Sequence, residues 1–485
     1  MTSLQEVYQL FLKSSGVQTD SRKVKSNQLF FALKGPNFDA NAFAHQTIEK
    51  GALAAIVDNK AIADANQACY LVDDVLETLQ ALAHHHRKQF NIPVLALTGS
   101  NGKTTTKALI DTVLSTTYTV LATEGNLNNH IGVPLTLLRL KKAHSHAIIE
   151  MGANHLKEIA FLCEIAQPTY GLITNVGKAH LEGFGSEEGV LQGKTELYRY
   201  LEKTNGLIFV DEENPKLISS LGKNHYVTYN SRSIEIVEEE PTLTVCMEQL
   251  TVKTKLTGSY NNANIAAAYC VGMHFGVAPK DAASAITNYA PNNSRSQLRI
   301  QNGKTLTLDA YNANPTSMQA AIRAFSKRQG KKAVILGHMA ELGSFEQAEH
   351  RSLVKLVGTL DFDSCYWVGQ PYKSLVEENW FSSVAELADF LKNNPIDATE
   401  ILLKGSRSAT LEQVIELFVM GKYLILSGFL LVVMGIIWIA AEQYGYKNPL
   451  DLRWEKGNTK VYFPLGTSIL ISLALSLIFY LFKRL

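Results

Sequence analysis

Cysteine is scarce in this sequence and occurs only singly. The 485 residues include five cysteines, and no two of them form a Cys-X-X-Cys pair. This pattern argues against a disulfide framework and against a zinc site held by cysteines, and it suits a reducing cytoplasm. A basic excess is absent too, because 46 Lys and Arg stand against 45 Asp and Glu, which leaves a formal net charge of +1. A charge so close to zero gives no indication of nucleic-acid binding.

Signal-peptide features are missing from the first ten residues, MTSLQEVYQL. A secretory signal has a basic stretch followed by a long apolar one, and neither is present here. We therefore expect the residues before the first long apolar run to remain in the cytoplasm. At about 100 to 200 residues per domain, the length of the chain predicts about three or four domains.

Two long uncharged runs lie near the C-terminus. Residues 423–441 form a run of 19 residues, and residues 461–482 a run of 22. As a helix, each can cross a hydrocarbon layer of about 30 Å, at about 1.5 Å per residue. A pair of buried core helices is the alternative, but apolar residues occupy all sides of both runs. We predict a two-span transmembrane hairpin at residues 420–485, with both of its ends in the cytoplasm.

The remaining sequence predicts three α/β domains. Residues 1–92 mix short apolar runs with helix-like stretches, which indicates a small α/β domain. In residues 93–290, apolar runs at 93–97, 146–149 and 170–173 alternate with helical patterns. Such alternation is typical of a parallel sheet. It returns in residues 291–419, where apolar runs at 305–308, 333–336, 365–368 and 401–403 predict a second βα-repeating domain.

A glycine-rich turn follows the first apolar run of the central domain. Such a turn, placed between a strand and a helix, aims backbone N–H groups and the positive helix end at phosphate oxygens. A lysine adds a point charge, and a threonine hydroxyl can bind Mg²⁺. The generic pattern would place a glycine where Leu97 stands, so a simple turn with a solvated lysine is the alternative. We predict a nucleoside triphosphate site formed by Gly99, Ser100, Asn101, Gly102, Lys103, Thr104 and Thr105.

Three further residues are candidates for chemistry. Glu150 ends an apolar strand, where an open α/β sheet binds ligands, and its carboxylate could hold a hard cation. A helix cap is an equally ordinary role for such a residue. His180 and Lys194 stand alone in the sequence, and isolated residues of these types are usually structural or solvated.

Taken in order, several motifs resemble the Mur ligases, the ATP-dependent amide-forming enzymes of peptidoglycan precursor synthesis. The family's phosphate loop corresponds to residues 98–105, with Ser100 in its third place. Further matches are residues 125–129 followed by 132–136, residues 174–182, and residues 261–264. The resemblance covers about residues 15–418 and implies a UDP-substrate-binding N-terminal domain, a central ATP-binding domain with a P-loop ATPase-like sheet, and a C-terminal Rossmann-like domain.

The resemblance also implies roles for individual residues. Lys103, Glu150, His180 and Lys194 form the catalytic set, in which Thr104 and Glu150 hold one Mg²⁺ and His180 helps to hold a second. Lys194 matches a lysine that family members carry as a carbamate derived from CO₂. Contacts with adenine, phosphate and ribose are implied for Asn264, Arg295 and Asp309. The remaining substrate contacts are implied for Ser21, Arg22 and Lys34 at the uridine diphosphate, for Asn128 and Asn129 at the muramoyl end, and for Tyr311, Asn312 and Asn314.

Within the family, residues 311–318 and 336–343 are similar to the member that adds D-alanyl-D-alanine to UDP-MurNAc-tripeptide. The implied reaction runs through an acyl phosphate made with ATP. His338 and Leu308 depart from the family pattern, since aspartate is usual at both positions. The alternatives are another Mur-type ligase, including a folylpolyglutamate-type enzyme, and a non-catalytic nucleotide-binding module.

The sequence from residue 420 onward resembles a free-standing family of small two-span membrane proteins of unknown function. We therefore expect a gene fusion in which residues 423–482 tether a cytoplasmic, monomeric catalytic unit to the inner leaflet of the bacterial membrane.

Overall fold

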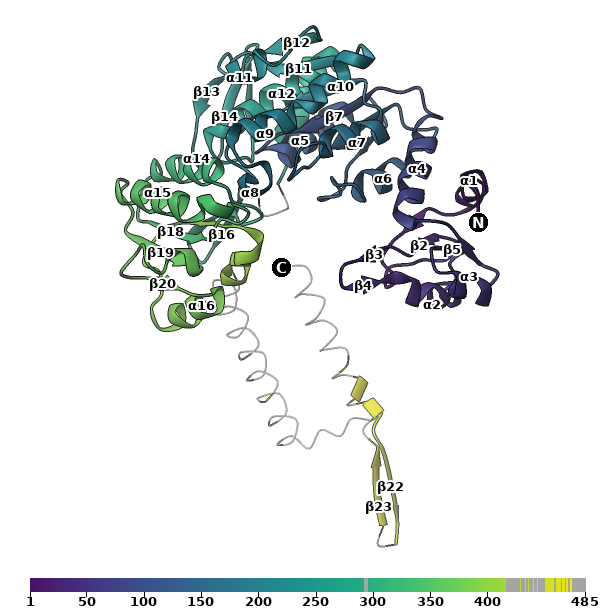
Figure 1. Cartoon of the computed structure of the whole chain (residues 1–485). Coiled ribbons are helices and arrows are strands. Elements are labelled where there is room, and N and C mark those ends of the chain that lie inside the picture. The colour runs from purple at the N-terminus through teal and green to yellow at the C-terminus, as the bar shows by residue number, and fades with distance from the viewer. Residues whose placement is uncertain are drawn as a thin grey trace. The chain divides into compact units, whose positions relative to one another are not determined.

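The computed structural model describes residues 1–291 and 295–415 and, in the C-terminal tail, residues 428, 432, 435, 439, 443, 450–457, 459–463, 465, 466, 468, 469 and 472. Met1–Ile415 form one compact unit, and Glu416–Leu485 belong to a second. Figure 1 shows the chain with its helices and strands labelled.

The first sheet is built from short apolar strands near the N-terminus. Its four strands are parallel and lie in the order β1-β2-β5-β6. All residues of β2 and β5 are buried, as expected for a parallel sheet covered by helices. The elements are α1 (Leu4–Lys13), β1 (Val17–Gln18), β2 (Leu29–Phe31), α2 (Ala44–Glu49), β5 (Ala54–Val57), α3 (Lys60–Ala65), β6 (Cys69–Leu71) and α4 (Val75–Arg87), with a separate hairpin of β3 (Lys34–Gly35) and β4 (Phe38–Asp39).

A six-stranded parallel sheet follows, in the order β12-β11-β10-β7-β9-β8. Strand β7 lies between β10 and β9, so three carboxyl ends meet at the middle of one sheet edge. The strands are β7 (Val94–Thr98), β8 (Val120–Ala122), β9 (His146–Glu150), β10 (Tyr170–Ile173), β11 (Leu207–Asp211) and β12 (His225–Tyr229). The helices of this region are α5 (Lys103–Leu114), α6 (Gly132–Leu137), α7 (Glu158–Ala166), α8 (Leu181–Phe184), α9 (Glu187–Lys194), α10 (Glu196–Thr204), α11 (Pro215–Ile218), α12 (Asn262–His274) and α13 (Pro279–Asn288).

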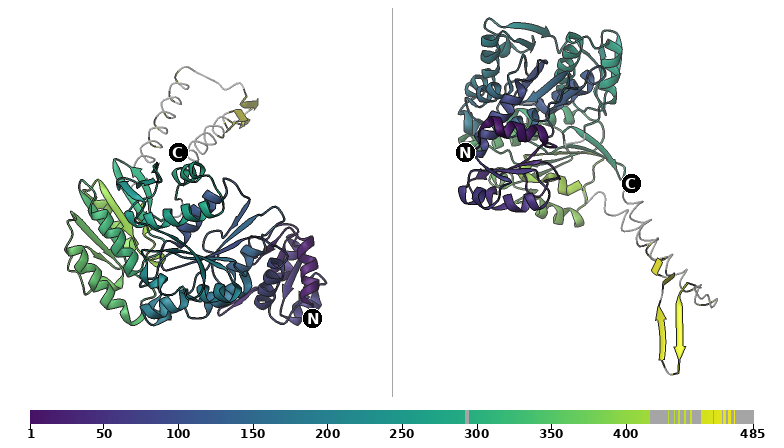
Figure 2. Two further views of the ribbon diagram at one scale, coloured as in Figure 1. Left: turned by 90° about the horizontal axis from the view of Figure 1, so that it is seen from above. Right: turned by 90° about the vertical axis from the view of Figure 1, so that its right-hand side faces the viewer.

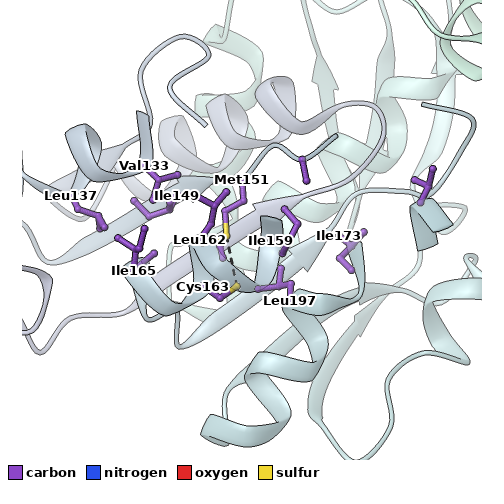
Figure 3. Close-up of a cluster of buried hydrophobic side chains, with 14 of the residues drawn as sticks. Val133, Leu137, Ile149, Met151, Ile159, Leu162, Cys163, Ile165, Ile173 and Leu197 are labelled. Carbon is purple, nitrogen blue, oxygen red and sulfur yellow. Dashed lines mark hydrogen bonds between the residues drawn. The ribbon is translucent and has the colours of Figure 1, made fainter. Parts of the chain in front are cut away.

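Alternate side chains of β7 enter two different cores. Val94 and Ala96 pack in a cluster with residues of α6, α7 and α10, and Figure 3 shows part of it, including Ile149 and Leu162. Leu95 and Leu97 pack on the other face with residues of α5, α12 and α13. Because helices cover both faces, β7 is a continuous apolar run and ends abruptly in the glycine-rich turn.

The third large sheet has the order β16-β17-β21-β18-β19-β20. Only β16 runs antiparallel to its neighbour, and the other pairs are parallel. Its elements are β16 (Gln297–Gln301), β17 (Lys304–Asp309), α14 (Pro315–Ser326), β18 (Lys332–Gly337), α15 (Glu346–Gly358), β19 (Ser364–Val368), β20 (Trp380–Phe381), α16 (Val384–Asn393) and β21 (Glu400–Lys404). A small antiparallel sheet is formed by β13 (Glu235–Glu238), β14 (Thr244–Met247) and β15 (Leu250–Lys253). Figure 2 shows these sheets from two further directions.

The structure confirms the α/β class and the strands predicted in the central and C-terminal regions. Each apolar run singled out at 93–97, 146–149, 170–173, 305–308, 333–336, 365–368 and 401–403 overlaps a strand. The prediction succeeded because a strand buried on both faces is apolar throughout its length, which is visible locally in the sequence.

The start of the second predicted membrane span needs correction. Residues 461–463 lie in β23 (Thr459–Phe463), which pairs antiparallel with β22 (Leu452–Lys456). Gly457 has a φ of 62° in the turn between them, and such left-handed turns followed by β-branched and aromatic residues favour a hairpin. Most of residues 423–441 and of residues 461–482, where we predicted the two spans, lies outside the described residues. Within the described part of the chain, no helix combines the length and the apolar character that crossing a membrane requires.

Candidate active site

A cavity of about 660 Å³ opens at the carboxyl ends of the central strands, and its lining includes residues from the C-terminal sheet. The β-strand register brings Leu97 of β7 opposite Glu150 of β9, and Thr98 opposite Ile173 of β10. The three loops that follow these strands therefore start at one level. The predicted site residues that line the cavity are Ser100, Asn101, Gly102, Lys103, Thr105, Asn128, Asn129, Glu150, His180, Asn264, Arg295, Asp309, Tyr311, Asn312 and Asn314.

The glycine-rich turn depends on two glycines in left-handed conformations. Gly99 has a φ of 141°, and a Cβ there would lie 2.0 Å from the Thr174 hydroxyl oxygen. Gly102 precedes α5 with a φ of 79°, and its Cβ would lie 2.5 Å from Oδ1 of Asn264. Only glycine combines this backbone geometry with such close approaches. The turn is therefore held by contact with segments far away in the sequence.

The backbone of the turn is tied to the segment after β10. The Asn175 carbonyl accepts from the Ser100 N–H at 2.9 Å, and Oδ1 of Asn175 accepts from the Asn101 N–H at 3.0 Å. The Ser100 hydroxyl donates to the Gly177 carbonyl at 3.1 Å. Lys103 folds back over the turn, and its Nζ donates to the Gly99 carbonyl at 2.7 Å. Burial lowers the pKa of Lys103. The loop is thus fixed by hydrogen bonds and carries a lysine at the start of a helix, an arrangement that suits phosphate binding.

Glu150 is one of the carboxylates that line the cavity and is almost completely buried. Its Oε1 accepts from Nδ2 of Asn128 at 2.8 Å and from the Thr104 hydroxyl at 3.2 Å. Its Oε2 accepts no hydrogen bond, although Nζ of Lys107 lies 3.4 Å away. A buried carboxylate oxygen without a donor, beside a threonine hydroxyl, fits a hard divalent cation that prefers oxygen ligands.

His180 and Lys194 have polar partners other than Glu150 and Thr104. His180 adopts a left-handed φ of 53° and its Nδ1 contacts the carboxylate of Glu341, whose pKa is lowered by that hydrogen bond. Lys194 is fully buried, and its Nζ donates to the Ala153 carbonyl at 3.0 Å. Burial lowers the pKa of Lys194 well below its ordinary value, and the nearby charge of Lys103 lowers it further. Among the described residues, no three His, Cys, Asp or Glu side chains form a group suited to a metal ion.

The other end of the cavity is formed with the C-terminal sheet. The register places Asp309 at the end of β17 opposite Lys404 at the end of β21, and their side chains form an ion pair. The guanidinium of Arg295 lies 4.0 Å from the ring centroid of Tyr311. Asn264 donates to Oδ1 of Asn261 at 2.8 Å. A carboxylate, an amide and an aromatic ring beside an arginine can together bind a nucleoside.

Several predicted residues do not join this cavity. Arg22 is exposed and pairs with Asp20, while Lys34 pairs with Asp58 at 2.8 Å. Ser21 does not line the cavity, and its backbone carbonyl accepts a hydrogen bond from Nζ of Lys50. Gly99, Thr104 and Lys194 are absent from the lining, although Thr104 touches Glu150. The N-terminal candidates therefore form no common site with the phosphate loop in this structure.

Polar residues of the site that were not predicted include Lys107, Asn175, Glu341 and Lys404. Lys107 lies one helical turn after Lys103, so its spacing was a usable signal. Lys404 directly follows an apolar strand run, as Glu150 does. Asn175 and Glu341 lie inside the motifs at 174–182 and 336–343, but nothing in their local sequence indicates their contacts.

Known families match nearly the whole chain. Residues 13–87 match the Mur ligase family catalytic domain, residues 97–272 the Mur ligase middle domain, and residues 294–428 the Mur ligase glutamate ligase domain. Residues 421–482 match a protein of unknown function, DUF2905, which confirms the expected fusion to a small protein family.

Individual proteins and solved structures are also similar to this chain. The UDP-N-acetylmuramoyl-tripeptide--D-alanyl-D-alanine ligase of Bacillus subtilis (strain 168) is 34% identical over 83% of this chain and 92% of its own length. The Haemophilus influenzae enzyme of the same name is 35% identical over 82% and 92%. The crystal structure of MurF from Acinetobacter baumannii has a TM-score of 0.76 at 30% identity, covering 85% of this chain and 98% of that one. MurF ligase from Thermotoga maritima, in complex with ADP, has a TM-score of 0.74 at 27% identity over 84% and 97%. The chain belongs to the Mur ligase family, in the branch of the UDP-N-acetylmuramoyl-tripeptide--D-alanyl-D-alanine ligases.

Proposed function

We propose that this chain joins D-alanyl-D-alanine to UDP-MurNAc-tripeptide at the expense of ATP. The observation that carries the proposal is the meeting of the glycine-rich turn, Glu150 and the C-terminal ion pair of Asp309 and Lys404 around one cavity. The ADP in the Thermotoga maritima structure and the names of the relatives support it.

The chemistry requires that an inert carboxylate be activated. The γ-phosphoryl group of ATP moves to the terminal carboxylate of the tripeptide, which gives an acyl phosphate and ADP. The amine of D-alanyl-D-alanine then attacks the acyl carbon, phosphate leaves, and the amine gives up a proton. The backbone N–H groups of the turn and Lys103 bind and orient the phosphates, where electrostatic positioning contributes most to phosphoryl transfer.

Mg²⁺ would be held by Thr104 and Glu150, with His180 at a second ion, and it would neutralise charge on the phosphates. Lys194 suits modification by CO₂, because burial lowers its pKa and so favours the neutral amine that reacts. As a carbamate it would add a carboxylate-like ligand to the catalytic set.

The proposed function also assigns residues to each part of the substrates. Asn264, Arg295 and Asp309 hold the nucleoside and phosphates, while Asn128 and Asn129 face the muramoyl end. Ser21, Arg22 and Lys34 bind the uridine diphosphate, and Tyr311, Asn312 and Asn314 complete the substrate contacts. The domains end at about residues 92, 290 and 419, and the catalytic unit acts as a monomer.

Replacing Lys103 tests this function. Lys103→Ala should abolish the release of ADP that depends on both the tripeptide precursor and D-alanyl-D-alanine, whereas the exposed Lys142→Ala should retain it. The protein is also incubated with tripeptide precursors that contain lysine or diaminopimelate, and with folate substrates. Mass spectrometry of the products then shows which type of Mur ligase reaction the protein catalyses. Turnover of the Lys103 variant within tenfold of the wild type would refute the phosphate-loop assignment.

The tail suits a membrane tether for this enzyme. Residues 423–441 carry no charge, and neither do residues 464–482 after the β22–β23 hairpin. A tether would raise the local concentration of the ligase at the inner leaflet. Fractionation of cell lysates tests the proposal: the full chain should sediment with membranes and a chain ending at residue 415 should not. Recovery of the full chain in the supernatant would refute it.

A further inference from the structure

Lys107 lies on the inner face of α5 and is almost completely buried. Its Nζ is 3.4 Å from the carbonyl of Gly125 and 3.4 Å from Oε2 of Glu150. Burying an ammonium group without a counter-charge is costly, so Glu150 is the partner that makes this position of Lys107 tolerable.

The two oxygens of Glu150 are used differently. Asn128 and Thr104 both donate to Oε1, which fixes the plane of the carboxylate. Oε2 forms an ion pair with Lys107, but the geometry is not that of a hydrogen bond. The lone pairs of Oε2 therefore have no donor. The carboxylate is therefore held in place by neutral donors. Two lysines act on its charge: Lys107 lies at ion-pair distance, and Lys103 acts without such a contact.

The Gly125 carbonyl restricts where Lys107 can move. The same loop carries Asn128, so Lys107 and Asn128 together join the loop to Glu150 from two sides. A divalent cation placed at Oε2 would lie close to the Lys107 ammonium in a poorly solvated site, where like charges repel strongly. Polyphosphate oxygens bound at the adjacent turn would supply the negative charge that offsets this repulsion.

We propose that Lys107 is the resident counter-ion of Glu150 and that it makes divalent-cation binding at this carboxylate conditional on the nucleotide. This role rests on the proposed function, because it assumes that Glu150 holds the metal of the ATP site. Lys107 is thus a positioning residue that acts through Glu150, and in this proposal it sets the order in which nucleotide and metal bind.

Binding of Mn²⁺ to the full-length protein, followed by electron paramagnetic resonance without substrates, tests the proposal. Lys107→Met removes the charge and keeps the length of the side chain, so Mn²⁺ should bind about tenfold more tightly in the absence of nucleotide. Lys107→Arg retains the charge and should bind as the wild type does, as should the control Lys142→Met. With ADP present, the difference in Mn²⁺ affinity between the wild type and Lys107→Met should become smaller.

A second variant, Glu150→Gln, tests whether Lys107 affects Mn²⁺ binding through Glu150. In Glu150→Gln, adding Lys107→Met should leave Mn²⁺ binding unchanged, and a change there would overturn the assignment. Unchanged or weaker Mn²⁺ binding by folded Lys107→Met would also overturn it. If Lys107→Met does not fold, Lys107→Gln takes its place with the same expectation. Because the readout needs no ligase turnover, failure of this proposal is distinct from loss of ADP release in the Lys103 experiment.

Discussion

Nδ2 of Asn314 donates a hydrogen bond to Oδ1 of Asn101 at 2.7 Å. Asn101 belongs to the glycine-rich turn and Asn314 is the N-cap of α14, so this bond links the phosphate loop directly to the C-terminal sheet region. The Thr316 hydroxyl adds a second link by accepting from the Lys178 N–H at 3.1 Å. At the same time Oδ1 of Asn314 caps α14 by accepting from the Ser317 N–H at 2.9 Å.

Asn314→Ser should separate these two roles. Serine is a good helix cap but has no amide to reach Asn101. The loss of one hydrogen bond, worth about 1 kcal/mol, should raise the KM for ATP about fivefold and leave the melting temperature nearly unchanged. Steady-state kinetics and thermal melting check this, with the exposed Asn393→Ser as control. An unchanged KM would show that the bond does not assist nucleotide binding.

Replacement of Lys194 tests the proposed carbamate. Lys194→Ala should lose ligase activity, and added short carboxylates should restore part of it by filling the space of the modified side chain. Because burial lowers the pKa of Lys194, its amine is neutral at a lower pH than an exposed lysine and can react with CO₂. Carbon-13 NMR of protein equilibrated with labelled bicarbonate should show one carbamate signal that Lys194→Ala lacks and the exposed Lys203→Ala keeps. Full activity of Lys194→Ala would exclude a catalytic carbamate.

Acid should destabilise the folded chain through buried histidines. His350 accepts from the Met339 N–H at Nε2 and is bonded through Nδ1 to the Glu346 carbonyl, so it is neutral with the proton on Nδ1. Burial lowers its pKa below the ordinary value of 6.5. The unfolded chain then binds this proton at a higher pH than the folded one, so stability is lost as pH falls below about 6.5.

His350→Leu removes this contribution. The variant should be less stable than the wild type at pH 7.5, but its melting temperature should fall less between pH 7.5 and pH 5.5. Other histidines, including His86, are also buried with lowered pKa values, so part of the acid sensitivity should remain. An equal fall in wild type and variant would show that His350 does not titrate differently on folding.

The ion pair of Asp309 and Lys404 should contribute mainly by mutual neutralisation. Lys404 is 1% exposed. Removal of Lys404 leaves the partly buried carboxylate of Asp309 unpaired, so Lys404→Met should destabilise the protein by about 2–3 kcal/mol. The double variant Asp309→Asn with Lys404→Met should be more stable than the sum of the single effects predicts. Chemical unfolding of the four proteins measures this coupling, and strict additivity would contradict it.

Local patterns in the sequence predicted the strands and the glycine-rich turn, but they could not predict contacts made across the fold. The turn is recognisable because strand, glycines, lysine and helix are consecutive from Val94 onward. Lys404 meets Asp309, 95 residues away in sequence, only because β17 and β21 pair in parallel register. Likewise Lys107 and Glu150 meet through the pairing of β7 with β9. The start predicted for the second membrane span at residue 461 was wrong because uncharged residues suit a strand as well as a helix.

The close approach of Asn264 to Gly102 restricts which residues can replace this glycine. Even a single methyl group at position 102 would collide with the amide that lies behind the loop, and no shift of a flexible side-chain end would relieve the left-handed backbone. In a library containing every substitution, selection for function should therefore retain glycine at this position, while Gly358 at the end of α15, which has open space around it and no left-handed backbone, tolerates alanine more readily.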